Sequence, residues 1–235
     1  MVKEDHSTVG IICPCLEQKQ FMRKIQSARI PDDYAKATVK EFNPSVYMDE
    51  INVDKAKYAK KVAVRFVEKY HDLQELGKGL YFYSNVKGSG KTHLAISITN
   101  ALIQKYNIQP LYISSVNLLG EIKKTFHPTA KTTTYDLLTS FKEAEVLVLD
   151  DFGVEKATEW SEEILTEILE ERMNYKRLTI ITSNIPIAQL STKYPAGRIE
   201  SRIEKMTFPV SMPEESVRRL LSKKENDQIA EMFFE

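Results

Sequence analysis

One stretch, Gly79 to Leu94, constrains the fold of this chain more than any other. It reads GLYFYSNVKGSGKTHL, in which an apolar run leads into a glycine-rich turn and then into a helical pattern. The aromatic run Leu80 to Tyr83 suits a buried strand, and Gly88 and Gly90 let the backbone turn tightly and approach a ligand. From Leu94 onward, apolar residues recur at i, i+4, i+7 and i+8, as one face of a helix requires. The stretch therefore predicts a strand, a phosphate-binding loop and a helix.

The expected loop supplies the contacts that a nucleoside triphosphate needs. Its backbone N–H groups and the helix N-terminus hold the β-phosphate, the lysine reaches the β- and γ-phosphates, and the threonine hydroxyl binds Mg²⁺. The usual spacing, G-x-x-x-x-G-K-[ST], puts an asparagine where the first glycine belongs; asparagine accepts positive φ more readily than most residues. The predicted nucleotide-binding residues are Asn85, Gly88, Ser89, Gly90, Lys91 and Thr92.

Length and charge limit the class of protein. A chain of 235 residues with 42% hydrophobic content can bury one good core. Its 33 basic and 33 acidic residues cancel, so contact with nucleic acid would come from local patches and not from the overall charge. The sequence has no apolar stretch near 18 residues and no signal-peptide core, and we expect a cytoplasmic protein that does not contact a membrane.

The cysteines lie two residues apart near the start of the chain. A cytosolic environment would keep Cys13 and Cys15 reduced. With His6 they offer at most three zinc ligands, whereas a structural zinc site needs four. We therefore interpret them as ordinary cysteines and do not predict a metal site there.

The rest of the chain alternates between helical and strand patterns. A helix is expected over residues 16–27, and Pro31 and Pro44 interrupt the pattern after it. The alternation predicts an α/β fold with a parallel sheet and crossover helices. The lysine-rich face of the helix at 54–70 is interpreted as solvated surface. Further helices are expected over residues 54–70, 116–126, 135–144 and 159–175, and further strands over 110–115, 146–149 and 178–181.

Two predicted strands end in polar residues suited to phosphate chemistry. Asp150 and Asp151 follow the run Val146 to Leu149, and the carboxyl ends of parallel strands are where ligands bind in open α/β sheets. Asp150 is expected to hold Mg²⁺ through its water shell, and Asp151 to orient the attacking water, a role that glutamate fills more often. Asn184 follows the strand at 178–181, where a neutral amide can hold that water or sense the γ-phosphate.

The order of GSGKT, VLVLDDFG, TIITSN and GRIESRI resembles that of the AAA+ ATPases of the DnaC and DnaI helicase-loader group and of their relative IstB, the transposition helper. The resemblance covers roughly residues 13–220. It implies a P-loop NTPase fold of the AAA+ type with a minimal C-terminal lid. It also implies an N-terminal extension that links to a partner, over residues 1–45, ahead of an ATPase domain over 46–235.

The resemblance also implies further site residues and partners. Arg202 matches the arginine finger that reaches a neighbouring subunit's ATP, with Arg198 as the second choice, and Arg218 matches the sensor II arginine. Each could instead be a surface arginine paired with a nearby glutamate. Single-stranded DNA is expected to contact Lys123, Lys124 and Lys131. The implied partners are a replicative DNA helicase and further copies of the chain, with ATP hydrolysis weak alone and stimulated by assembly or DNA.

Two other functions stay open. An IstB-like transposition helper would act on duplex DNA with a transposase. An ATP-gated adaptor would bind ATP and hydrolyse it negligibly, which the asparagine in the loop and the aspartate at position 151 both allow. The loaders often have a larger N-terminal domain than this chain shows, so helicase binding is less firmly implied than ATP binding.

Overall fold

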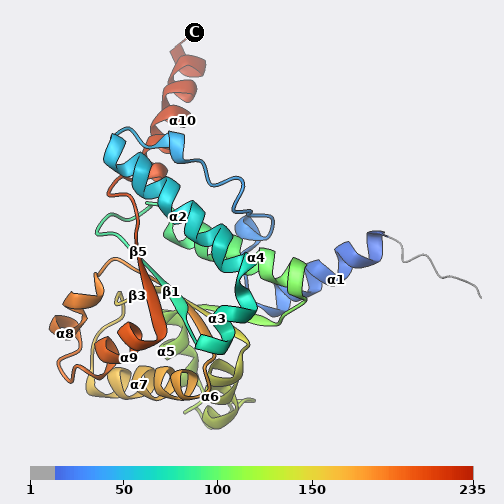
Figure 1. Cartoon of the computed structure of the whole chain (residues 1–235), viewed down its shortest axis with the longest axis vertical. Helices are drawn as coiled ribbons and strands as arrows, with labels where there is room; N and C mark the ends of the chain where they lie inside the picture. The colour runs from blue at the N-terminus through green and yellow to red at the C-terminus, as the bar shows by residue number, and fades with distance from the viewer. Residues whose placement is uncertain (1–13, 235) are drawn as a thin grey trace, which may run out of the picture.

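Five parallel strands form the centre of the computed structural model, which describes residues 14–234 (Figure 1). They are hydrogen-bonded in the order β2-β3-β4-β1-β5, so β1 lies between two strands that come much later in the chain. This confirms the α/β class and the AAA+ type of P-loop fold. The strands are β1 Gly79–Tyr83, β2 Pro110–Ser114, β3 Val146–Phe152, β4 Leu178–Ser183 and β5 Thr207–Ser211.

Helices cover both faces of the sheet, as Figure 1 shows, with α2 and α4 on one side and α5, α6, α7 and α9 on the other. Successive residues of β3 supply the two cores in turn, because side chains alternate across a strand. Val146 and Val148 join the core under α2 and α4, while Leu147 and Leu149 join the core under α7. All four are fully buried, which explains the continuous apolar run.

The helices that the sequence predicts begin close to the expected residues, whereas α3, α8, α9 and α10 are not among the predicted helices. Asp49 caps α2 by accepting from the N–H groups of Ile51 and Asn52, so this helix starts a few residues earlier than expected. Thr158 and Ser161 form a capping box at the start of α7. The α-helices are α1 Pro14–Ser27, α2 Glu50–Glu68, α3 Tyr70–Leu76, α4 Lys91–Tyr106, α5 Ser115–Lys124, α6 Thr134–Glu143, α7 Glu159–Asn174, α8 Leu190–Lys193, α9 Arg198–Met206 and α10 Val217–Phe234.

Strand β5 is absent from the sequence-based prediction. Its sequence, TFPVS, contains Pro209, which cannot donate a ladder hydrogen bond and normally argues against a strand. Here β5 pairs only with β1, at the edge of the sheet, where the other side of the strand needs no partner. Phe208 is 48% exposed on this edge.

The segment before α2 packs on the same core as α4. Ile25, Ala28 and Phe42 are buried there. The amide of Asn100, on α4, donates to the carbonyl oxygens of Tyr34 and Ala37 at 2.9 and 3.0 Å. Packing is therefore continuous across residue 45, and the functional division of the chain at that point stays a prediction.

Some expectations fall outside what the structure describes. Cys13 and His6 lie in residues 1–13, so the interpretation of the cysteines stays a prediction. Among the described residues, no helix has both the length and the apolar character to cross a membrane. Helix α10 follows β5 as a single helix and extends away from the body of the molecule (Figure 1).

Candidate nucleotide-binding site

The loop between β1 and α4 has the backbone that its glycines predict. Gly88 and Gly90 have φ of 80° and 89°, in the left-handed region that favours glycine. A Cβ on Gly90 would lie 2.8 Å from the ring of Phe42, so the close approach also requires glycine. The expectation for Asn85 is wrong in one respect: Asn85 is not among the described residues with positive φ. It is exposed, its N–H donates to the Glu214 carboxylate at 3.3 Å, and it does not line the cavity described below.

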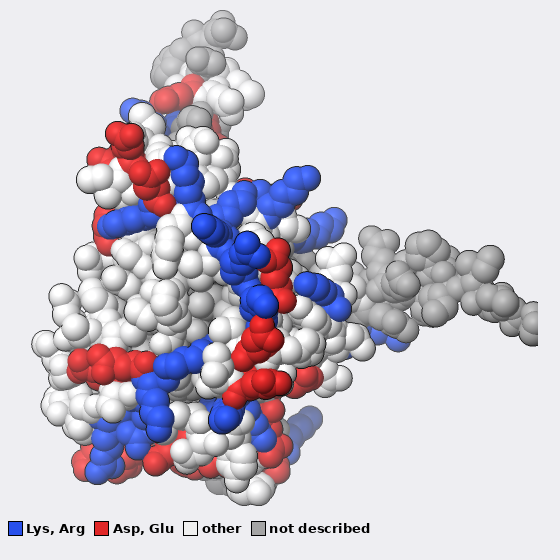
Figure 2. All heavy atoms as spheres, viewed as in Figure 1, with Lys and Arg blue, Asp and Glu red and all other residues white. Residues whose placement is uncertain are grey.

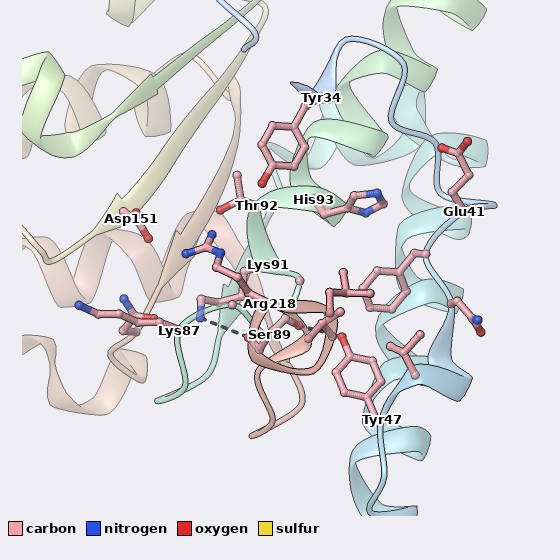
Figure 3. A pocket seen from close by; sticks show the side chains of 18 of the residues that line it. Tyr34, Glu41, Tyr47, Lys87, Ser89, Lys91, Thr92, His93, Asp151 and Arg218 are labelled. Carbon is pink, nitrogen blue, oxygen red and sulfur yellow. Dashed lines mark hydrogen bonds between the residues drawn. The ribbon is translucent and has the colours of Figure 1, made fainter. Parts of the chain in front are cut away.

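Lys91 is folded back onto the loop. The side chain is 5% exposed, and its ammonium donates to the carbonyl oxygens of Val86 at 2.9 Å and Ser84 at 3.3 Å. It also lies 3.3 Å from the Ser89 hydroxyl (Figure 3). Burial lowers the pKa of Lys91, and the charge of nearby carboxylates, Asp151 foremost, acts in the opposite direction. The loop thus holds a cation beneath the position where phosphates would bind.

Asp150 is the centre of a hydrogen-bond network. Its carboxylate accepts from the hydroxyl groups of Thr92, Thr182 and Tyr112 at 2.8, 2.6 and 2.7 Å. The burial of Tyr112 and the charge of Asp150 raise the pKa of the tyrosine, which keeps it a donor. Asp150 is 5% exposed, so the network holds a buried carboxylate in one orientation. The adjoining oxygen atoms of Thr92 and Asp150 are hard ligands and fit a Mg²⁺ ion that also binds phosphate and water.

Asp151 points into the pocket from the end of β3. Its backbone has φ of 50°, and its N–H donates to the Thr182 hydroxyl at 3.0 Å. On the other side, the Ser115 hydroxyl donates to the Asp151 carbonyl oxygen at 3.0 Å. Desolvation and, next, the charge of Asp150 raise the pKa of Asp151. Both contacts fix the backbone of the residue that was predicted to orient water.

Lys91, Thr92 and Asp151 line one cavity of about 520 Å³ (Figure 3), whereas Asp150 does not line it and is linked to it by its hydrogen bond with Thr92. Asn184 also lines it, so the sheet edge brings together residues predicted from three separate motifs. The members that the sequence predicts are Gly88, Ser89, Gly90, Lys91, Thr92, Asp151, Asn184 and Arg218.

An aromatic wall completes the cavity, and the sequence did not predict it. Tyr34, Phe42 and Tyr47 come from the segment before α2 and line the pocket with His93 of α4. The Tyr47 hydroxyl donates to the Ser89 carbonyl oxygen at 2.9 Å, and the rings of Phe42 and His93 lie 6.1 Å apart. Flat rings beside a phosphate loop suit the base and sugar of a nucleotide. No local pattern marks these residues, apart from their aromatic character.

The two predicted arginine sites differ. Arg218, in the first turn of α10, lines the cavity, and a Cβ on Gly88 would lie 3.1 Å from its Cβ. Arg202 of α9 does not line the cavity. Its guanidinium pairs with the Glu170 carboxylate of α7 at 2.9 Å and donates to the Arg198 carbonyl oxygen at 3.0 Å. The structure therefore does not bring Arg202 together with the other predicted nucleotide-binding residues.

The three lysines predicted to contact DNA are exposed and lie apart from the cavity. Lys123 and Lys124 are in the last turn of α5, and Lys131 is in the loop before α6. The ammonium of Lys123 lies 5.0 Å from the ring centre of Trp160, which orients it.

Comparison with known proteins agrees with a nucleotide-binding site. The family model described as IstB-like ATP binding protein matches residues 15–218. The protein YqaM of Bacillus subtilis is 26% identical over 184 residues, which cover 76% of this chain and 55% of YqaM. The replicative helicase loader DnaC of Buchnera aphidicola from Schizaphis graminum is 24% identical over 172 residues, covering 72% of this chain and 68% of DnaC. This chain thus spans about half of YqaM and about two thirds of that DnaC.

Solved structures show the same fold. A crystal structure of the DnaC helicase loader has a TM-score of 0.66 at 25% identity, covering 77% of this chain and 99% of the other. That of DnaI has a TM-score of 0.63 at 28% identity, covering 77% and 94%. AMPPCP-bound DnaA from Aquifex aeolicus shares the fold, with a TM-score of 0.57 at 20% identity, covering 82% and 55%. The family match spans most of the chain and includes every residue that lines the cavity except Leu221, and the chain belongs to the family of IstB-like ATP-binding proteins.

Proposed function

We propose that this chain is a cytoplasmic ATPase that binds Mg·ATP and single-stranded DNA and delivers a replicative DNA helicase. The observation that carries the proposal is the shared cavity of Lys91, Thr92, Asp151 and Asn184, with Asp150 bonded to Thr92. Several relatives at 23–28% identity are named replicative helicase loaders, which supports a replicative helicase as the partner.

In the proposed hydrolysis, each of these residues has one role. Lys91 gives up its loop carbonyl contacts for the β- and γ-phosphates, and Thr92 and Asp150 would hold a Mg²⁺ ion that would neutralise phosphate charge. Asp151 orients the attacking water and Asn184 contacts that water or the γ-phosphate. Arg218 contacts the nucleotide bound in its own subunit. The aromatic wall takes the adenosine.

The first prediction separates nucleotide binding from hydrolysis at Asp151. Asp151→Asn should keep Mg·ATP affinity within about threefold and slow turnover by about 10²–10³-fold, because an amide orients water poorly and accepts no proton. Steady-state phosphate release and equilibrium binding of ATP measure the two effects.

Asp72→Asn is the matched control, since Asp72 is an exposed aspartate of α3 outside the cavity. It should change neither quantity. Full turnover by Asp151→Asn would transfer the water-orienting role to another residue, with Asn184 the next to test. A wild-type chain that binds ATP tightly and does not hydrolyse it, even on DNA, would favour the ATP-gated adaptor.

The second prediction concerns single-stranded DNA. If Lys123, Lys124 and Lys131 neutralise phosphates, log affinity should fall with log salt at a slope of about 0.7 per contact, and each Lys→Ala change should reduce that slope. Fluorescence anisotropy with a labelled oligonucleotide over a salt series measures it. Lys57→Ala, on the exposed side of α2, is the control. If none of the three substitutions changes DNA affinity or its salt slope, these lysines do not contact the DNA.

A transposition helper is the second candidate, because the matching family model carries the IstB description. Capture of purified candidate helicases and transposases, each with ATP and with ADP, separates the two. A loader should retain a replicative helicase in a nucleotide-dependent way and prefer single strands. Capture of a transposase with preference for duplex DNA would reverse the assignment.

A further inference from the structure

Glu215 does not line the nucleotide cavity, but its carboxylate joins two segments that do. The two carboxylate oxygens accept from consecutive backbone N–H groups, that of Met48 at 2.8 Å and that of Asp49 at 2.9 Å. Asn52, in the first turn of α2, donates its amide to the same carboxylate at 2.7 Å and accepts from the Glu214 N–H at 2.8 Å. These four hydrogen bonds fasten the loop between β5 and α10 to the start of α2.

The surroundings of Glu215 favour a charged carboxylate. The N-terminal end of a helix attracts negative charge, because its N–H groups carry partial positive charge. The N–H groups of Met48 and Asp49 lower the pKa of Glu215, and the Asn52 amide adds to this effect, whereas burial acts in the opposite direction. Figure 2 shows acidic and basic side chains mixed where α10 leaves the body of the molecule. Directed hydrogen bonds, and not a patch of positive charge on that face, therefore hold the carboxylate.

The two joined segments also contact the phosphate-binding loop, at consecutive residues. On one side, the Tyr47 hydroxyl donates to the Ser89 carbonyl oxygen at 2.9 Å. On the other side, the Val217 N–H donates to the Gly88 carbonyl oxygen at 3.0 Å. Because Tyr47 and Val217 each lie within two residues of the carboxylate contacts, the bonds close a ring. We call this the Glu215 ring; its members are Tyr47, Met48, Gly88, Ser89, Glu215 and Val217.

The ring holds two side chains that line the cavity, Tyr47 and Arg218 (Figure 3). Tyr47 is 4% exposed, and burial and then the charge of Glu215 raise its pKa, so the phenol remains a donor to the loop. The start of α10 lies close against the loop, because a Cβ on Gly88 would lie 2.7 Å from the Ser216 hydroxyl oxygen. Loss of the Glu215 carboxylate would leave both side chains in place chemically but would release the segments that carry them.

We propose that Glu215 is a positioning residue for ATP, which holds Tyr47 and Arg218 where both contact one nucleotide. The two side chains come from segments far apart in the sequence, one before α2 and one in α10, and the Glu215 ring ties both to the phosphate-binding loop. The inference rests on the proposed ATP site and adds to it a residue that does not line the cavity.

The test is a double-mutant cycle on ATP affinity, measured by calorimetric titration of the full chain with Mg·ATP. Glu215→Ala and Arg218→Ala should each weaken ATP binding about tenfold. In the Glu215→Ala background, Arg218→Ala should weaken binding by no more than about threefold further, because the arginine is no longer held at the nucleotide. Tyr47→Phe removes only the hydroxyl that bonds the loop, and its effect should likewise shrink in that background. A purely structural Glu215 would leave these effects additive.

Hydrogen exchange measures the Glu215 ring without nucleotide. Glu215→Ala should speed amide exchange in residues 46–52 and 214–220 together, because each segment loses the other as its support. Glu215→Gln keeps the side-chain length and one acceptor oxygen, so it should retain the fold and lose only about threefold in ATP affinity. This variant keeps the inference testable where Glu215→Ala does not fold.

Glu225→Ala is the matched control, the same substitution at an exposed residue of α10 outside the cavity. It should change neither ATP affinity nor exchange, and thermal unfolding verifies that each variant is folded. If the wild-type chain does not bind ATP, the proposed function fails and the inference fails with it. If the wild-type chain binds ATP, only the inference is overturned by full ATP affinity in Glu215→Ala or by additive effects of Glu215→Ala and Arg218→Ala.

Discussion

Replacing Arg202 with alanine is expected to lower ATP turnover by about 10³–10⁵-fold, although Arg202 touches no part of its own subunit's cavity. In phosphoryl transfer, negative charge gathers on the γ-phosphate oxygens. Within the subunit, Lys91 is the buried cation at the loop, and Arg218 reaches the cavity from α10. A further cation from a neighbour would complete the site.

The ion pair of Arg202 with Glu170 does not prevent this role. The Glu170 side chain is half exposed, but the Arg202 side chain is only 17% exposed, so Arg202 must leave this pair to reach a neighbour's cavity. Glu170→Gln should therefore leave turnover unchanged or raise it, whereas a purely structural pair would make both substitutions equally harmless to turnover. Arg198→Ala tests the second choice, since Arg198 is exposed on the same helix.

Mixing supplies the decisive form of this experiment. Arg202→Ala and Lys91→Ala subunits should each be nearly inactive, but a mixture can form interfaces with an intact loop on one side and an intact arginine on the other. Partial recovery of phosphate release supports an arginine that acts between subunits. Wild-type turnover by Arg202→Ala alone would return this residue to the role of a surface pair.

Lys91→Ala should reduce ATP affinity by about 10–100-fold, because a charge-assisted contact to phosphate contributes about 1.5–3 kcal/mol. The substitution also removes the donor to the carbonyl oxygens of Ser84 and Val86, so the loop loses two hydrogen bonds as well as a positive charge. Equilibrium titration with a fluorescent ATP analogue measures affinity, and thermal unfolding of the nucleotide-free protein measures any change in stability.

Lys87→Ala is the matched control, since Lys87 lines the same cavity as an exposed lysine. It should weaken ATP binding by no more than about threefold. Unchanged ATP affinity in a folded Lys91→Ala protein would show that the loop is not the phosphate site.

The sequence predicts the strands that are determined by residues within the strand itself. Apolar runs of four or more residues identify the buried strands β1, β3 and β4, and Asp-Asp and Thr-Ser-Asn mark where two of them end. Strand β5 has no such signal, because Pro209 is acceptable only at a sheet edge, and its edge position is a property of the whole sheet.

The parts of the site that the sequence misses depend on contacts between distant segments. Tyr112 reaches Asp150 across neighbouring strands, 38 positions away in the chain, and Phe42 faces His93 only because the N-terminal segment folds over α4. The partner of Arg202 illustrates the same limit. The alternative to an arginine finger is a surface pair with a nearby glutamate, and the structure instead pairs Arg202 with Glu170 of α7, 32 positions earlier in the chain.

The central claim, that ATP at this site drives delivery of a helicase, is tested most directly by loading onto a closed circle of single-stranded DNA. A circle has no end, so a helicase ring must be opened to enter it. With the wild-type chain and ATP, the helicase should become bound to the circle and then unwind an annealed strand. Lys91→Ala should fail at the first step, and Asp151→Asn should impair the cycle after it. Equal loading without the chain, or with Lys91→Ala, would contradict the account.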